Sequence, residues 1–266
     1  EFFDAFFSHS IIKRAIEAER LSVGVTNPRD FSHNKHGQVD DTPYGGGAGM
    51  LMMAPPIFEA VESVIAQYDS ETNSAYSTDE ICDEMSLIGN PSESIRRRVI
   101  FMGPTGQPFT QEKARELATY DQLVLICGHY EGVDYRVEEH LVDEIISIGD
   151  YVLTGGELPA MVVADAVARM IPGVLGAASG AQEDSFYEPL LECPQYTKPP
   201  EFRGWVVPDV LRSGHHKNIA TWRQKEALKR TRLLRPDLLE RPLTKEEIKL
   251  LKEIIAEESE RDTGEV

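Results

Sequence analysis

The chain has 266 residues, a formal net charge of −18 and 41% hydrophobic residues. This length predicts about two domains, each able to bury a core without disulfides or a structural metal ion. No apolar run approaches the ~20 residues of a membrane-spanning helix, and residues 1–4 do not resemble a secretory signal. The three cysteines, Cys82, Cys127 and Cys193, are odd in number and far apart. Such cysteines are typical of reduced thiols, so we expect a cytoplasmic protein.

Basic residues are concentrated in one segment. Residues 198–235 contain ten Lys or Arg and three Asp or Glu, a net charge of +7, so the rest of the chain sums to −25. Charges act locally, within a Debye length of about 10 Å at 0.1 M salt, so the overall negative charge does not exclude a nucleic-acid partner. The segment favours a polyanion that contacts this part of the chain only. The alternative is an ordinary solvated helix face.

In chain order, the first half of the sequence alternates helices and strands. The helix predicted at 55–68 has proline at its start and apolar residues every three or four positions. Residues 69–95 carry seven acids and no Lys or Arg, which predicts a surface insertion that is at least partly mobile. Strands are predicted at 98–102, 123–127 and 145–148, and helices at 110–119 and 157–171. This alternation predicts an α/β fold with a mainly parallel sheet.

The last third of the chain has a different pattern. Residues 176–186 are small and polar and predict an interdomain linker. The part that follows, 187–266, is predicted to be mostly helical. Its last helix opens at a capping box formed by Thr244 and Glu247. We therefore expect a larger domain at 1–175, the linker, and a smaller helical domain after it.

Several familiar signatures are absent from the sequence. The glycine-rich run 45–49 lacks the Lys-Ser/Thr of a phosphate-binding P-loop and follows no clear strand, so it is no dinucleotide fingerprint. His33 and His36 have no further ligands nearby, so no metal site is predicted. There is no G-x-S-x-G nucleophile motif.

Glycine-bearing loops follow three of the predicted strands, at 103–106, 128–132 and 149–156. Ligands of an open α/β sheet bind beyond the carboxyl ends of its strands. Glycine there lets backbone N–H and C=O groups approach a ligand closely. Together the loops could hold a nucleoside through main-chain hydrogen bonds; the alternative is three ordinary tight turns.

Six segments, in order along nearly the whole chain, resemble one protein family. They are DDTPYGGGAGMLMM (40–53), ICGHYEGVD (126–134), SIGDYVLTGGELPA (147–160), RMIPGVLG (169–176), EDSF (183–186) and ECPQYTKP (192–199). They resemble the bacterial tRNA (guanine-37-N1)-methyltransferases, the TrmD family of the SPOUT superfamily. The resemblance implies that S-adenosylmethionine methylates N1 of guanine 37 in tRNA, on the 3′ side of the anticodon. It also implies a deep trefoil knot in the α/β domain, and a homodimer whose active sites combine the knot of one subunit with the linker and C-terminal domain of the other.

The resemblance assigns site residues as well. In the family the three glycine loops bind the cofactor, and the matching residues are Met102, Pro104, Gly106, Gly128, Tyr130, Glu131, Ile148, Gly149, Tyr151, Leu153, Gly155, Gly156 and Pro159. Four residues resemble those that line the pocket for the target base: Asp40, Tyr44, Gly49 and Met50. Arg223 and Lys225, in the basic segment, are candidates for tRNA phosphates. Trp205 and Trp222 are predicted to lie in a helix core; the alternative is that they are platforms for bases.

The chemistry of the implied reaction needs a base and a cation. Guanine N1 carries a proton at neutral pH, and a positioned carboxylate that accepts it accelerates such a step by about 10²–10⁴-fold. A guanidinium would stabilise the negative charge that grows on guanine O6. By resemblance, Asp184 is the base, Arg169 is the cation, and Glu131 helps to place the cofactor or a Mg²⁺ ion.

Two other functions stay open on the sequence alone. One is a knotted RNA methyltransferase with a different target, and the other is a non-catalytic protein that binds RNA or a nucleotide. The chain also departs from the family in two places. It lacks the short first strand, ending in Phe-Pro, that normally precedes residues 1–3, and its acidic stretch at 69–95 is longer than usual.

Overall fold

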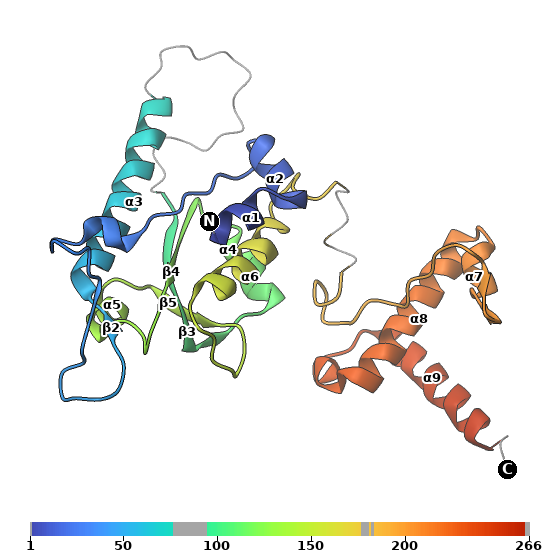
Figure 1. The fold of residues 1–266 in the computed structure, drawn as a ribbon. Helices are drawn as coiled ribbons and strands as arrows, with labels where there is room; N and C mark the ends of the chain where they lie inside the picture. Colours follow the sequence, from blue (N-terminus) through green and yellow to red (C-terminus); the bar gives the residue numbers. More distant parts are fainter. Residues whose placement is uncertain (1, 77–94, 177–180, 182–183, 264–266) are drawn as a thin grey trace. The chain divides into compact units, whose positions relative to one another are not determined.

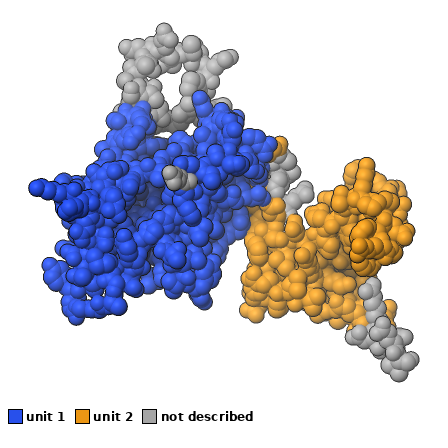
Figure 2. All heavy atoms as spheres, viewed as in Figure 1, with its two compact units in different colours: residues 1–175 blue, residues 176–266 orange. Residues whose placement is uncertain are grey.

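The chain divides into two compact units, residues 1–175 and 176–266 (Figures 1 and 2). The computed structural model describes residues 2–76, 95–176, 181 and 184–263. Across these ranges, no helix is both long enough and apolar enough to cross a lipid bilayer.

The first unit is built on a parallel sheet with the strand order β4-β3-β5. Its strands are β3 (Arg97–Pro108), β4 (Gln122–Cys127) and β5 (Glu144–Ser147). The predicted α/β fold with a parallel sheet is therefore confirmed. The predicted turn at 103–106 lies inside β3, where these four residues bulge out between Met102 and Gln107. Both of these residues pair with Ile146, so β3 continues beyond the bulge.

Helices cover both faces of this sheet (Figure 1). Those of the first unit are α1 (Phe2–Phe7), α2 (Ser10–Glu17), the 3-10 helix η1 (Pro28–Phe31), α3 (Ala54–Tyr76), α4 (Gln111–Leu117), α5 (Tyr135–His140) and α6 (Glu157–Ala168). Val99 and Phe101 pack in one core with α3 and α5, whereas Ile100 and Met102 pack in another with α4 and α6. Successive side chains of a strand point to opposite faces, so the continuous apolar run of β3 serves both cores.

The ends of two helices follow from local sequence. Thr110 caps α4, as its hydroxyl accepts a hydrogen bond from the Lys113 N–H at 3.2 Å. α3 continues to Tyr76, so residues 69–76 of the predicted insertion extend the helix that was expected to end at residue 68. Asp69, within that part of α3, forms an ion pair with Arg97 of β3. Residues 77–94, the rest of the predicted insertion, lie outside the described residues.

The second unit is mostly helical, as predicted. Its elements are the strands β6 (Glu201–Phe202) and β7 (Trp205–Val206), the helices α7 (Asp209–Arg212), α8 (His216–Leu234) and α9 (Lys245–Thr263), and the 3-10 helix η2 (Pro236–Leu239). Leu228 of α8 and Leu250 and Ile254 of α9 form its core. The capping box of α9 is confirmed: the Glu247 N–H donates to the Thr244 hydroxyl at 3.2 Å, and the Thr244 N–H donates to the Glu247 carboxylate at 2.7 Å.

The two tryptophans of the second unit differ in position. Trp222 is half-buried on α8, with its ring 6.4 Å from that of Tyr196. Trp205 lies in the hairpin formed by β6 and β7, and 69% of its surface is exposed. The expectation of a helix-core position is therefore wrong for Trp205, because the residues around it form a short hairpin instead of a helix.

Candidate functional site

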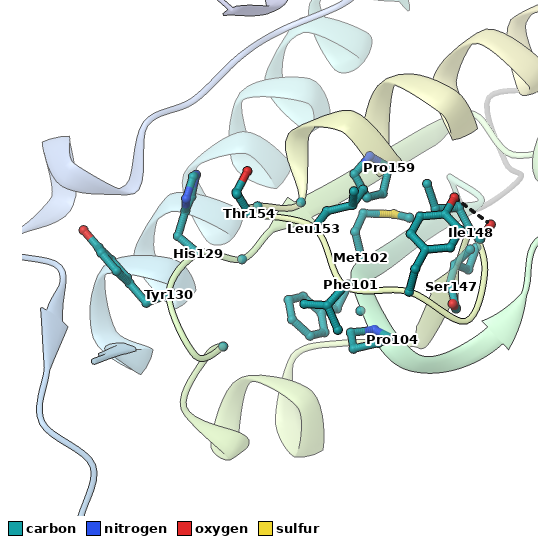
Figure 3. Close-up of a pocket in the computed structure, with 18 of the residues that line it drawn as sticks. Phe101, Met102, Pro104, His129, Tyr130, Ser147, Ile148, Leu153, Thr154 and Pro159 are labelled. Atoms are coloured by element: carbon teal, nitrogen blue, oxygen red, sulfur yellow. Dashed lines mark hydrogen bonds between the residues drawn. The ribbon is translucent and has the colours of Figure 1, made fainter. Parts of the chain in front are cut away.

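A cavity of about 150 Å³ lies at the carboxyl ends of the three parallel strands. Its wall is formed by residues 101–104, 128–132, 146–149 and 151–156, together with Pro159 of α6. Figure 3 shows His129 and Tyr130 on one side of it and Ser147 and Ile148 on the other. Ligands of open α/β sheets bind at this edge, so the cavity is the candidate functional site of the first unit.

The structure brings the predicted cofactor residues together. All of them line this cavity except Gly106, which packs against the backbone of Ile145 beside it. Sequence reasoning missed three polar side chains in the wall, those of His129, Ser147 and Thr154. His129 and Thr154 lie within the glycine loops 128–132 and 149–156, so their positions in these loops could have indicated that they line the cavity.

Close backbone packing explains why residue 156 is a glycine. The Gly156 N–H donates to the Gly128 carbonyl at 2.8 Å, which joins the third loop to the second. A Cβ atom on Gly156 would lie 2.6 Å from Cys127 Cα and 2.8 Å from Gly128 N. Only glycine allows this approach, so it fixes the two loops against each other at the cavity wall.

The charges at the cavity are few. Of the described residues that line it, none is Lys or Arg, and Glu131 contributes a carboxylate. Beside the cavity, Nε2 of His129 contacts the carboxylate of Glu157, in the first turn of α6. A phosphate group would normally be held by Arg or Lys side chains. This wall therefore favours a ligand that is neutral or positive near Glu131.

Cys127 stands at the end of β4, behind the cavity. Its burial, together with the negative charge of Glu157, raises the pKa of the thiol to about 12. A thiol with such a pKa is protonated at neutral pH, and only the thiolate is a strong nucleophile. Covalent chemistry on Cys127 is therefore not favoured.

The glycine-rich segment reaches the rim of the cavity. The short strands β1 (Asp40–Asp41) and β2 (Leu51–Met52) pair and close the loop between them. The Glu131 N–H donates to the Met50 carbonyl at 3.1 Å, and a Cβ on Gly49 would overlap the Glu131 side chain. Gly49 and Met50 thus adjoin the cavity through Glu131. Asp40 lies at the base of the loop, and Tyr44 is fully exposed in it.

Arg169 lies away from this cavity. It is the C-cap of α6, whereas Pro159, near the start of the same helix, forms part of the cavity wall. The helix has 12 residues, and at 1.5 Å per residue it is about 18 Å long. Within one chain, Arg169 and the cavity are therefore at opposite ends of α6.

Asp184 belongs to the second unit, where it lines a separate cavity of about 350 Å³ together with Arg223. The loop that carries it is held by hydrogen bonds. The Glu192 N–H donates to the Ser185 hydroxyl at 2.9 Å, and the Leu191 N–H donates to the hydroxyl of Thr231 on α8 at 2.9 Å. Asp184 is thus carried by a loop that is attached to α8.

The two predicted phosphate ligands are placed differently on α8. Arg223 is exposed at the cavity beside Asp184. Nζ of Lys225 lies 2.5 Å from Oε1 of Glu257 on α9, and this ion pair offsets much of its charge. Of the two, Arg223 is thus better placed to attract a phosphate group.

Comparison with known proteins gives a consistent result. The profile of the family described as tRNA (Guanine-1)-methyltransferase TrmD matches residues 1–241. The chain is 53% identical over 255 residues to a tRNA (guanine-N(1)-)-methyltransferase of Desulforamulus reducens, which covers 96% of this chain and 91% of that protein. Proteins of the same name from Dehalococcoides mccartyi strain CBDB1 and Brevibacillus brevis are 50% identical over 260 residues and 52% identical over 255 residues. These matches cover 97% and 96% of this chain and 95% and 94% of the respective relatives.

Proposed function

The chain belongs to the tRNA (guanine-1)-methyltransferase family, TrmD, and on that premise we propose that it transfers a methyl group from S-adenosylmethionine to N1 of guanine 37 in tRNA. The observation that carries the proposal is the cavity at which three glycine loops meet. The first unit is then the cofactor-binding catalytic domain, and the second unit binds tRNA. We assign the protein to the cytoplasm, where its tRNA substrate is found.

The residues of the cavity fit this methyl donor. The apolar side chains of Met102, Ile148 and Leu153 suit the adenine ring, and the glycine loops offer backbone donors and acceptors for its polar edge. The carboxylate of Glu131, with no Lys or Arg in the described wall, suits a ligand that carries a positive sulfur. When bound, S-adenosylmethionine supplies a methyl group that is already activated for transfer.

The task of the protein's own side chains is to prepare guanine. The Asp184 carboxylate accepts the N1 proton, and the Arg169 guanidinium stabilises the negative charge that moves to O6. Asp184→Asn keeps the size of the side chain and removes the base, so we expect turnover to fall by about 10²–10⁴-fold. Cofactor affinity, measured by calorimetry, should stay unchanged. Wild-type turnover in this variant would remove Asp184 from the mechanism.

A homodimer would complete the site, and two observations support it. Arg169 and the cofactor cavity are at opposite ends of α6, so a site assembled from two subunits can bring them together. The same helix leaves Leu158 and Val162, one turn apart, 46% and 47% exposed. Exposed apolar residues that adjoin one another mark interaction surfaces. In this proposal, the cavity of one subunit works with the linker and second unit of its partner.

Two further features belong to this proposal. We propose that the first unit is knotted, as its family is, and the glycine-tight packing of Gly156 against Cys127 suits a chain that threads closely past itself. The second feature is a Mg²⁺ ion that assists the reaction, with Glu131 helping to place it. Residues 2–76, 95–176, 181 and 184–263 contain no cluster of three ligating side chains for it. Turnover with and without EDTA decides whether the reaction needs the ion.

The decisive experiment uses an unmodified tRNA transcript. The protein and S-adenosylmethionine are added, and the digested RNA is analysed by mass spectrometry for N1-methylguanosine. A transcript with adenine at position 37 is the matched control. Methylation of guanine 37 alone supports the proposal. A ribose methyl group would favour a different knotted methyltransferase, and cofactor binding without turnover would favour a non-catalytic binding protein.

A further inference from the structure

The short hairpin of the second unit, residues 201–206, displays aromatic side chains to solvent. Phe202 and Trp205 face each other across its two strands, with ring centroids 6.2 Å apart and an interplanar angle of 50°. They are 55% and 69% exposed, and the adjacent Val206 is 54% exposed. Large adjoining apolar side chains are usually buried, and where they stay in solvent they mark a surface for a partner.

The hairpin is preorganised by its turn. Its central residues, Arg203 and Gly204, have φ of +55° and +84°, and left-handed φ at both positions gives the turn that matches the twist of two short strands. Beyond the strands, the Val207 N–H donates to the Pro200 carbonyl at 2.9 Å and closes the base of the hairpin. The aromatic side chains are thus presented on a defined backbone.

The basic segment around the hairpin, together with Arg203 within it, indicates the kind of partner. The Arg203 guanidinium lies 5.0 Å above the Phe202 ring, and the hairpin belongs to the segment 198–235, which has a net charge of +7. Proteins hold unpaired nucleobases by stacking them on aromatic rings and guanidinium planes, with basic groups near the phosphates. A second copy of this chain fits less well, because a symmetric contact through the hairpin would set Arg203 against its own copy.

We infer that this aromatic hairpin is a stacking platform for an unpaired base of the tRNA, separate from the residues that line the cavity beside Asp184. The inference rests on the proposed function, because it names an additional contact for the same substrate. It also accounts for the exposed position of Trp205, which is not part of the hydrophobic core of the second unit.

Stacking and charge can be separated by salt. Attraction to phosphates weakens as salt rises, with a slope set by the number of contacts, whereas stacking releases few counterions. Trp205→Ala should therefore weaken binding of an unmodified tRNA transcript by roughly 5- to 150-fold at every salt concentration, with the slope unchanged. Trp205→Phe, which keeps an aromatic face, should recover most of the affinity. Unchanged melting temperature would show that the exposed Trp205 side chain can be removed without unfolding.

A spectroscopic readout tests the contact itself. The chain has two tryptophans, so a Trp222→Phe variant reports on Trp205 alone. Saturable quenching of its fluorescence by tRNA supports stacking. Wild-type tRNA affinity in Trp205→Ala, together with unquenched fluorescence, would overturn the inference. Conversion of the protein to a smaller species by Trp205→Ala, seen by sedimentation, would also overturn it, since the hairpin would then join two copies.

The wild-type protein, assayed in parallel, keeps the two proposals apart. If it forms no N1-methylguanosine, the proposed function fails. If it does form N1-methylguanosine and Trp205→Ala binds tRNA equally well, only the platform fails. Cofactor affinity of Trp205→Ala should match the wild type, because Trp205 belongs to the second unit and the cofactor cavity to the first.

Discussion

The substitution Gly156→Ala tests whether tight loop packing forms the cofactor cavity. The added Cβ would lie 2.6 Å from Cys127 Cα, whereas ordinary contacts begin at 3.4 Å. The two backbone segments must therefore separate by about 0.8 Å. This movement would stretch the 2.8 Å hydrogen bond from the Gly156 N–H to the Gly128 carbonyl, which joins the two loops.

The expected magnitudes follow from this overlap. Overpacking of this kind typically costs about 1–3 kcal/mol of stability. A loss of that size lowers the melting temperature of a domain this large by roughly 2–12 °C. Because both loops line the cavity, we expect S-adenosylmethionine to bind at least tenfold more weakly, which is about 1.4 kcal/mol of binding free energy.

The assay is isothermal calorimetry with S-adenosylmethionine, combined with thermal unfolding. Gly24→Ala is the matched control, because a Cβ there meets no atom within 4 Å and that backbone is not left-handed. It should bind the cofactor as the wild type does. If Gly156→Ala kept both wild-type affinity and wild-type melting temperature, the argument that only glycine allows this packing would be refuted.

Three further predictions concern the second unit. Hydrogen bonds from the Arg241 side chain and the Thr244 N–H lower the pKa of the buried Glu247 to about 2, although burial alone would raise it. The ionised carboxylate therefore contributes about 3 kcal/mol to the free energy of unfolding above pH 4.5, and this contribution is lost as the pH falls toward 2. Glu247→Gln should remove this dependence from urea unfolding curves recorded at pH 7 and pH 3. Thr231→Val leaves the Leu191 N–H without its acceptor, so turnover should fall with cofactor affinity unchanged, and Thr231→Ser should restore it. Arg223→Ala should reduce the salt slope of tRNA binding by about one, and Lys225→Ala by less, because Glu257 already offsets the charge of Lys225.

Local signals were sufficient for much of the fold. Thr110 and Thr244 predicted their helix starts, because a cap depends on residues three positions away. The continuation of β3 past Gly103 was not predictable in the same way. It depends on pairing with Ile146, about forty residues further along the chain, and the local pattern there reads as a turn.

The features of the candidate site also differ in whether local sequence predicts them. The three glycine loops could be placed at one edge of the sheet from strand order and backbone chemistry alone, and the cavity lies there. The contact between His129 and Glu157 escaped notice because it joins residues 28 positions apart. The exposure of Trp205 was missed because composition gives the charge of a segment but does not show which of its side chains a hairpin turns outward.

The division of the chain into two units has a consequence for the proposed reaction. The described residues that line the cofactor cavity lie within 101–159, whereas Asp184 is carried by a loop attached to α8 through Thr231. The described residues that line this pocket all belong to the first unit, so it can bind its ligand before the base arrives. Proton removal then depends on where the second unit holds Asp184, and tRNA contacts that unit as well. Substitutions there should therefore change tRNA affinity and turnover and leave the affinity for S-adenosylmethionine unchanged, which links the chemical step to the presence of the correct RNA.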